Sequence, residues 1–145
     1  MRKTLLLASV AVLAVSVATS ASAGGNGAAR SGLSPQTGST TDQCVAGSGA
    51  GTNGFAIVNA PGQPGNARFV NGEVSLKNGP ANTSYTVWLN DGSTCHPEPA
   101  VLTTNGQGNG NAHLNDATLS SGTFYVVLQD TTGNEQFATA PVTVN

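Results

Sequence analysis

The feature that most limits how this chain can fold is a series of short apolar runs separated by clusters of turn-forming residues. Many of the runs are rich in Val, Thr, Tyr and Phe, which favour β-strands, while Gly, Asn and Pro fill the stretches between them. No segment keeps a sustained 3.6-residue period, so long helices are not expected. The pattern predicts seven or eight strands, in the stretches QCVAG, GFAIVNA, ARFVNGEVSL, SYTVWLN, AVLTTN, NAHLND, GTFYVVLQD and QFATAPVTV.

Alternation within these runs assigns core faces, because successive side chains of a strand point to opposite sides of the sheet. The run GTFYVVLQD is apolar on both faces, as expected of a central strand, whereas Pro141 places the last run at an edge or a bulge. The predicted fold is all-β, a β-sandwich of about seven to eight strands. Its predicted core is formed by Val74 and Leu76, by Tyr85, Val87 and Leu89, and by Phe124, Val126 and Leu128.

The first 23 residues have the form of a secretory signal peptide. Arg2 and Lys3 give a positive start, residues 5–17 are apolar but too few to span a bilayer, and residues 21–23 form an A-x-A cleavage site. We therefore expect cleavage after Ala23, which leaves Gly24 as the N-terminus of a secreted, extracellular protein. Retention of the segment as an uncleaved anchor stays open.

Residues 24–42 are rich in Gly, Ser and Thr and have almost no apolar side chain to bury, which predicts a flexible leader. Residues 43–145 then form one domain. After cleavage, three basic residues stand against seven acidic ones, a net charge of about −4. This balance disfavours nucleic acid and anionic lipid as partners, because both are bound through clustered Lys and Arg.

Cys44 and Cys95 are the only cysteines of the chain. Two cysteines in an exported protein are usually oxidised, so we predict a disulfide between them that joins the first strand to the loop after the Trp88 strand. Closing a loop of this length stabilises a domain by roughly 4 kcal/mol. His96 and Glu98, in the same loop, are interpreted as solvated residues.

No residues of the sequence have the spacing of a catalytic or metal-binding site. The two cysteines and two histidines, Cys44, Cys95, His96 and His113, are too scattered for zinc, and neither G-x-S-x-G nor H-E-x-x-H occurs. The stretch NGQGNGN, residues 105–111, lacks the carboxylates of a calcium loop and the lysine of a phosphate loop, which favours a flexible hairpin connection.

We expect no cofactor, no metal and no enzymatic activity. His113 lies on the polar face of its run, where exposure is favoured over a catalytic role. A hydrolase, the less favoured alternative, would need two carboxylates brought together from the acids near strand ends, which are Asp91, Glu98, Asp116, Asp130 and Glu135.

Two stretches resemble known extracellular modules. PANTSYTV, residues 80–87, resembles the P-x-T-x-Y-x-V stretch of fibronectin type III domains, with Thr83 and Tyr85 at the matching spacing. TTNGQGNG followed by SGTFYVVL is similar to the T-D-x-x-G … G-x-Y-x-V pattern of bacterial immunoglobulin-like and carboxypeptidase-regulatory-like modules, with Asn105 where an Asp is common. The resemblance implies an immunoglobulin-like β-sandwich of the kind found in small exported bacterial proteins, and it implies no active site.

Two non-enzymatic functions fit these observations. The first is a structural or protein-binding role at the cell surface or in the extracellular space. The second is carbohydrate binding, with Trp88 and Tyr125 forming an aromatic platform on one sheet. Exposure of Trp88 separates the two, because an immunoglobulin-like sandwich often buries one Trp between its sheets. We predict a secreted non-catalytic module whose partner is an extracellular protein or a polysaccharide, without a membrane-spanning segment after cleavage.

Overall fold

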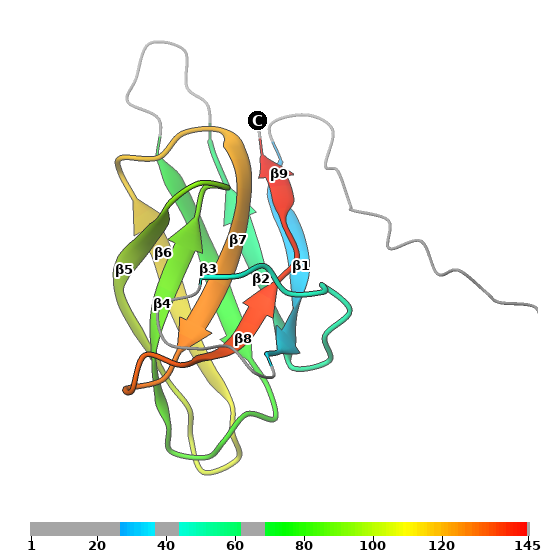
Figure 1. Ribbon diagram of the computed structural model, residues 1–145, viewed down its shortest axis with the longest axis vertical. Helices are drawn as coiled ribbons and strands as arrows, with labels where there is room; N and C mark the ends of the chain where they lie inside the picture. The colour runs from blue at the N-terminus through cyan, green and yellow to red at the C-terminus, as the bar shows by residue number, and fades with distance from the viewer. Residues whose placement is uncertain (1–26, 37–43, 62–68, 145) are drawn as a thin grey trace, which may run out of the picture.

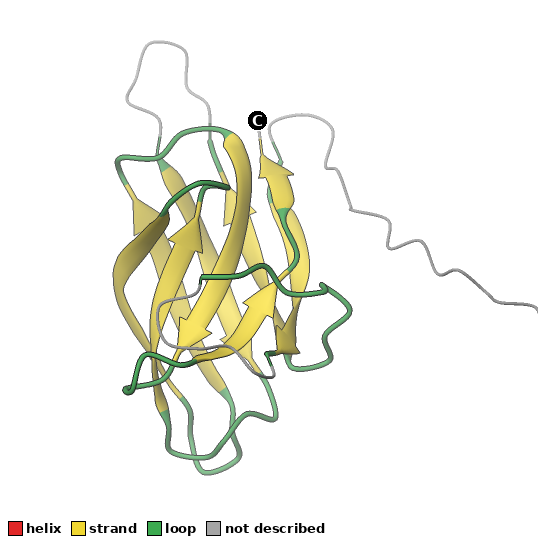
Figure 2. Cartoon of the chain, viewed as in Figure 1, coloured by secondary structure: helices red, strands yellow, loops and turns green. Residues whose placement is uncertain are grey.

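The computed structural model describes residues 27–36, 44–61 and 69–144, and the predicted signal peptide lies outside them. Figures 1 and 2 show that the described residues form strands and loops, without a helix. No helix in this part is therefore available to cross a membrane. The nine strands are β1 (Ala29–Pro35), β2 (Gly54–Asn59), β3 (Val70–Leu76), β4 (Ser84–Asn90), β5 (Cys95–Thr103), β6 (Gly110–Asp116), β7 (Gly122–Gln129), β8 (Glu135–Thr139) and β9 (Val142–Val144).

The strands pair antiparallel in the order β5-β4-β7-β8-β1-β2-β3-β6, and β9 pairs with β7. Figure 1 shows two layers, with β4, β7 and β8 in front of β2, β3 and β6. Strand β1 belongs to both layers, because residues 29–32 pair with β2 and residues 33–35 pair with β8. The two end strands, β5 and β6, lie close together without a ladder between them, so the all-β sandwich is a nearly closed barrel.

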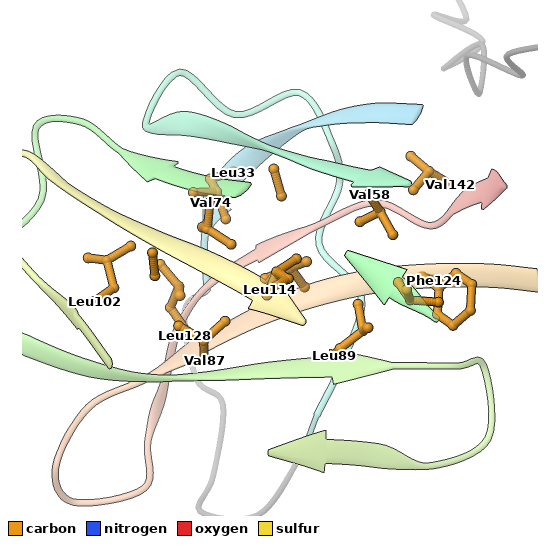
Figure 3. Close-up of a cluster of buried hydrophobic side chains, with 14 of the residues drawn as sticks. Leu33, Val58, Val74, Val87, Leu89, Leu102, Leu114, Phe124, Leu128 and Val142 are labelled. Atoms are coloured by element: carbon orange, nitrogen blue, oxygen red, sulfur yellow. The ribbon is translucent and has the colours of Figure 1, made fainter. Parts of the chain in front are cut away.

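Apolar side chains from the two layers meet in one core (Figure 3). The ring of Tyr85 packs edge-on against that of Phe137, with centroids 6.0 Å apart. Burying each large apolar side chain contributes roughly 1.5–3 kcal/mol. The predicted core residues are confirmed, since Val74, Leu76, Tyr85, Val87, Leu89, Phe124, Val126 and Leu128 are all buried.

Each predicted run from GFAIVNA onward contains a strand, and Ala140 and Pro141 divide the last run into β8 and β9. This division accounts for one strand beyond the predicted seven or eight. In the run QCVAG, residues 44–47 join no ladder and are not a strand, while Gln43 lies outside the described residues. The predicted hairpin at residues 105–111 is also wrong in one respect: it connects β5 to β6, and these strands do not pair.

The predicted flexible leader, residues 24–42, is wrong for residues 29–35, which form β1. Leu33 is completely buried, and Ser34 donates its hydroxyl hydrogen to the carbonyl oxygen of Ala138, 3.0 Å away. The strand is held by main-chain ladders on both sides and adds few apolar side chains to the core. Residues 24–26 and 37–42 of the predicted leader lie outside the described residues.

A segment without secondary structure, residues 44–51, runs across the outside of β7 and β8, and we call it the crossing segment (Figure 1). The main-chain N–H of Gly47 donates to the carbonyl oxygen of Thr139 at 2.8 Å, and that of Ser48 donates to the hydroxyl of Ser34 at 3.2 Å. Val127, which points away from the core, is nevertheless completely buried. The crossing segment thus gives the front layer a second covered surface.

Candidate binding site

The predicted disulfide between Cys44 and Cys95 is confirmed, with 6.2 Å between the two Cα atoms. The sequence predicted Cys44 in the first strand. It lies instead at the start of the crossing segment. Cys95 is the first residue of β5. The disulfide therefore fixes the crossing segment to an end strand of the barrel, and such a bond is typical of proteins from oxidising compartments.

Trp88 and Tyr125 lie side by side on the outer surface of the front layer. They are diagonal neighbours in the ladder, since Trp88 pairs with Val127 while Tyr125 pairs with Asn90. Trp88 is therefore not the central tryptophan that an immunoglobulin-like sandwich implies. It is partly exposed, and its indole nitrogen is enclosed without a partner among the described residues.

The hydroxyl of Tyr125 is used by the fold, because it donates to the carbonyl oxygen of Cys44 at 2.8 Å. Tyr125 is itself only partly exposed. One of the two aromatic residues thus holds the crossing segment in place. The hypothesis that Trp88 and Tyr125 bind carbohydrate stays a prediction.

Three of the five acids near strand ends organise turns. The Oδ1 atom of Asp130, for example, accepts hydrogen bonds from the main-chain N–H and the hydroxyl of Thr132, at 2.8 and 2.6 Å. Each of the three aspartates is followed two residues later by Ser or Thr, so the D-x-[ST] pattern in the sequence could have identified them. The pairs are Asp91 with Ser93, Asp116 with Thr118, and Asp130 with Thr132.

These turns favour the ionised carboxylates. Hydrogen bonds from the main chain of Thr94 and Ser93 hold the pKa of Asp91 well below its ordinary value, and the hydroxyl of Thr132 lowers the pKa of Asp130. Around Asp116, desolvation raises the pKa, but the hydrogen bonds from Thr118 outweigh it and the net pKa is lowered. All three aspartates are therefore charged at neutral pH as parts of turns.

We expected His96 to be a solvated loop residue. It belongs instead to β5 and lies beside the turn that precedes this strand. Its Nε2 atom is 3.2 Å from Oδ2 of Asp91, and both side chains are about one quarter exposed. The Oδ1 atom of the same carboxylate accepts the turn hydrogen bonds. This contact joins the two ends of the β4–β5 connection.

The two glutamates near strand ends are buried, which corrects the expectation that Glu98 is solvated. Glu135 is 2% exposed, and its Oε2 atom accepts a hydrogen bond from the main-chain N–H of Val45 at 2.9 Å. Glu98 is 5% exposed and points from β5 toward β6. Both carboxylates therefore tie together separate parts of the fold.

Glu98 connects the two end strands of the barrel. Its Oε2 atom accepts a hydrogen bond from the main-chain N–H of Asn115, on β6, at 3.0 Å, while its Oε1 atom is buried without a partner among the described residues. Pro97 and Pro99 have no N–H group, which limits the hydrogen bonds that β5 can donate to β6. A side chain thus bridges a seam that no ladder closes.

Burial raises the pKa of Glu98, although the hydrogen bond from Asn115 and the charge of His96 act in the opposite direction. Because the folded protein holds this proton more tightly than the unfolded chain, its contribution to stability is fully present below the unfolded pKa of about 4.3. That contribution is lost as the pH rises from the unfolded pKa of Glu98 through its raised pKa in the folded protein.

We expect Glu98→Gln to remove this decline of the free energy of unfolding above about pH 4.3, because the amide does not titrate and keeps an acceptor for the N–H of Asn115. Urea unfolding at several pH values measures it. The matched variant Glu98→Ala loses the bridge and should be less stable at every pH, by about 1–3 kcal/mol. An unchanged pH profile in Glu98→Gln would contradict the role of the carboxyl.

No three His, Cys, Asp or Glu side chains come together to form a metal site in the described ranges. A pocket of about 320 Å³ near the seam is lined by His96, Pro97, Glu98, Pro99, Asn115, Asp116, Ala117 and Thr118. Its acids are already bonded to the main chain, Glu98 to Asn115 and Asp116 to Thr118. This pocket therefore presents few free polar groups to a ligand.

A larger hollow, of about 570 Å³, crosses the outer surface of β2, β3 and β6, and we call it the outer groove. Aligned residues of neighbouring strands form its two rows. In one row Ile57 pairs with Glu73, which pairs with His113; in the other, Asn59 pairs with Asn71, which pairs with Asn115. The groove is lined by Ala28, Ile57, Asn59, Phe69, Asn71, Gly72, Glu73, His113, Leu114 and Asn115.

The polar side chains of the groove make no hydrogen bond or ion pair within the described residues. Some asparagines outside the groove differ from these, because the side chains of Asn53, Asn90 and Asn105 hydrogen-bond neighbouring loops and turns. His113 is exposed, as predicted. The groove thus collects unused donors and acceptors on one surface, and they are Asn59, Asn71, Glu73, His113 and Asn115.

Sequence reasoning identified His113 as an exposed polar residue but missed the groove. The alternation within ARFVNGEVSL and NAHLND is a signal that could have placed Asn71, Glu73 and Asn115 on outward faces. It did not show that β3 and β6 are neighbours, because β4 and β5 lie between them in the chain. The register that aligns the rows is therefore a property of the tertiary fold.

No protein-family model matches the chain, and searches of curated proteins and of solved structures find no similar protein.

Proposed function

We propose that the chain is a secreted, non-catalytic binding module that contacts an extracellular ligand through the outer groove. The signal-peptide pattern of residues 1–23 and the disulfide between Cys44 and Cys95 support the extracellular location. The low number of basic residues disfavours nucleic acid and anionic membranes as ligands.

The observation that carries the proposal is the set of unused polar groups around the outer groove. Its asparagines, Glu73 and His113 stand on strands whose opposite faces are packed in the core. The paired strands hold the main chain that carries these side chains, so a ligand does not have to order a loop when it binds.

The composition of the groove supports binding without catalysis. Among its described residues, Glu73 is the one carboxylate, whereas glycoside hydrolysis generally requires a pair. The other acids of the domain have structural roles: Asp91, Asp116 and Asp130 organise turns, and Glu98 and Glu135 connect separate segments.

A retention assay tests the proposal. The exported protein is incubated with insoluble cell-wall and plant polysaccharides and with cell-surface fractions, in parallel with Asn71→Ala/Asn115→Ala and with Gln107→Ala. Gln107 is an exposed control residue in the β5–β6 connection, at the other end of the barrel. We expect at least one fraction to retain the wild type and the Gln107 variant but not the double variant.

The same assay follows the bound material for cleavage products, and we expect none. Release of product that stops in Glu73→Gln, with the fold intact, would overturn the non-catalytic part of the proposal. Equal retention of the wild type and the double variant would overturn the assignment to the outer groove.

A further inference from the structure

We infer that the ligand of the outer groove is a neutral oligosaccharide segment of a polysaccharide. This inference rests on the proposed function and adds the chemical class of the ligand. It follows from the hydrogen-bonding groups, the charge and the strand arrangement of the groove.

The hydrogen-bonding groups suit hydroxyls. Each carboxamide of Asn59, Asn71 and Asn115 offers two donors and an acceptor, and the three residues form one row across β2, β3 and β6. A sugar carries neighbouring hydroxyl groups that both donate and accept. Three amides in a row therefore match a row of hydroxyls better than they match a ligand whose polar groups only accept hydrogen bonds.

The second row adds an apolar surface and little net charge. Ile57 lies beside Glu73, and Phe69, at the rim, is 37% exposed. Apolar side chains of this kind can cover the C–H face of a sugar ring. Arg30, on β1, lies over the ring of Phe55 at 4.0 Å, so its guanidinium already has an aromatic contact. With one carboxylate and no cluster of cations among its described residues, the groove favours an uncharged ligand.

The strand arrangement disfavours a peptide bound as an added strand. Strand β2 is paired with β1 and β3, and β3 is paired with β2 and β6, while the unpaired edge of the end strand β6 faces β5 rather than the groove. Addition of a peptide strand needs an unpaired edge with free main-chain groups. The groove instead offers side chains along about 10–14 Å, the width of three to four strands, which suits a short run of linked sugar rings.

Side-chain amide NMR signals test the inference directly. The exported protein, labelled with ¹⁵N, is titrated with cello-, xylo-, manno- and chito-oligosaccharides, with polygalacturonate as the anionic comparison. We expect one neutral oligosaccharide to shift the NH₂ signals of Asn59, Asn71 and Asn115 with saturation. Asn71→Ala should weaken its binding about tenfold, as expected for one lost hydrogen-bonding group. Gln107→Ala should leave the affinity unchanged.

The single tryptophan separates the two possible carbohydrate surfaces. Trp88 lies on the other layer, so binding in the outer groove should leave its fluorescence unchanged. A saturable fluorescence change without shifts at the asparagines would place the site at Trp88 and Tyr125 and overturn the inference.

The outcomes also separate this inference from the proposed function. If none of the neutral oligosaccharides binds, but a cell-surface fraction retains the wild type and not Asn71→Ala/Asn115→Ala, the groove binds a different class of ligand and only the inference fails. Selective binding of polygalacturonate would likewise overturn the neutral class. If no probe and no fraction distinguishes the wild type from the double variant, both proposals fail.

Discussion

Cys44→Ala/Cys95→Ala is expected to lower the free energy of unfolding by roughly 2–5 kcal/mol. The disulfide joins residues 51 positions apart, so its loss gives the unfolded chain much conformational freedom. It also frees the crossing segment, whose remaining contacts to the front layer include the hydrogen bond from Tyr125. Both effects lower the free energy of unfolding.

Urea unfolding of the oxidised protein and of the double variant measures this difference, and the double variant avoids leaving a reactive thiol. Ser48→Ala is the matched control, because Ser48 is an exposed residue of the crossing segment that uses its main-chain N–H for bonding. The control should stay within about 0.5 kcal/mol of the wild type. A double variant equally close to the wild type would contradict the stabilising role of the disulfide.

Gly51→Ala is expected to destabilise the fold by about 3 kcal/mol or more, at the upper end of the range for overpacking. A Cβ at this position would overlap the main chain of Leu33, in the middle of β1. Since the atoms that this Cβ would overlap belong to the main chain, no side-chain rotation can relieve the clash. Either the crossing segment or β1 would have to move.

Gly106→Ala is the matched control, because a Cβ there has nothing within 4 Å. Thermal unfolding followed by circular dichroism compares the two variants with the wild type. The Gly106 variant should unfold at the wild-type temperature and the Gly51 variant well below it. A Gly51 variant as stable as its control would show that the crossing segment does not pack closely on β1.

The main strands could be predicted from the sequence because their signal is local. In SYTVWLN, alternation alone placed Tyr85, Val87 and Leu89 in the core, and the structure buries all three. The run around Val126 is apolar on both faces, and both faces are indeed covered, one by the core and one by the crossing segment. Local patterns suffice where apolar side chains make the contacts.

The errors arose where the main chain makes the contacts. Strand β1 looked like a flexible leader because it contributes mainly Leu33 to the core and is otherwise fixed by ladders to β2 and β8. In the crossing segment, Gly47, Gly49 and Gly51 alternate because a Cβ at each would collide with β1, β8 or the residue that follows β8. Their spacing was visible in the sequence, but it is equally typical of a flexible stretch.

The candidate site was even less accessible to sequence reasoning. The aspartates at Asp116 and Asp130 could have been assigned to turns from the Thr two residues later. The outer groove, in contrast, depends on the register of β3 against β6, which places Asn71 opposite Asn115. A long-range register of this kind is set by packing of the whole barrel and leaves no local pattern.

The seam between β5 and β6 also bears on how copies of the protein behave at high concentration. An unpaired strand edge facing solvent can add strands from other chains and so begin aggregation. Here the two end strands face each other, Glu98 bridges them, and Pro97 and Pro99 remove donors from β5. We therefore expect copies of the protein at high concentration not to join through β5 and β6, edge to edge.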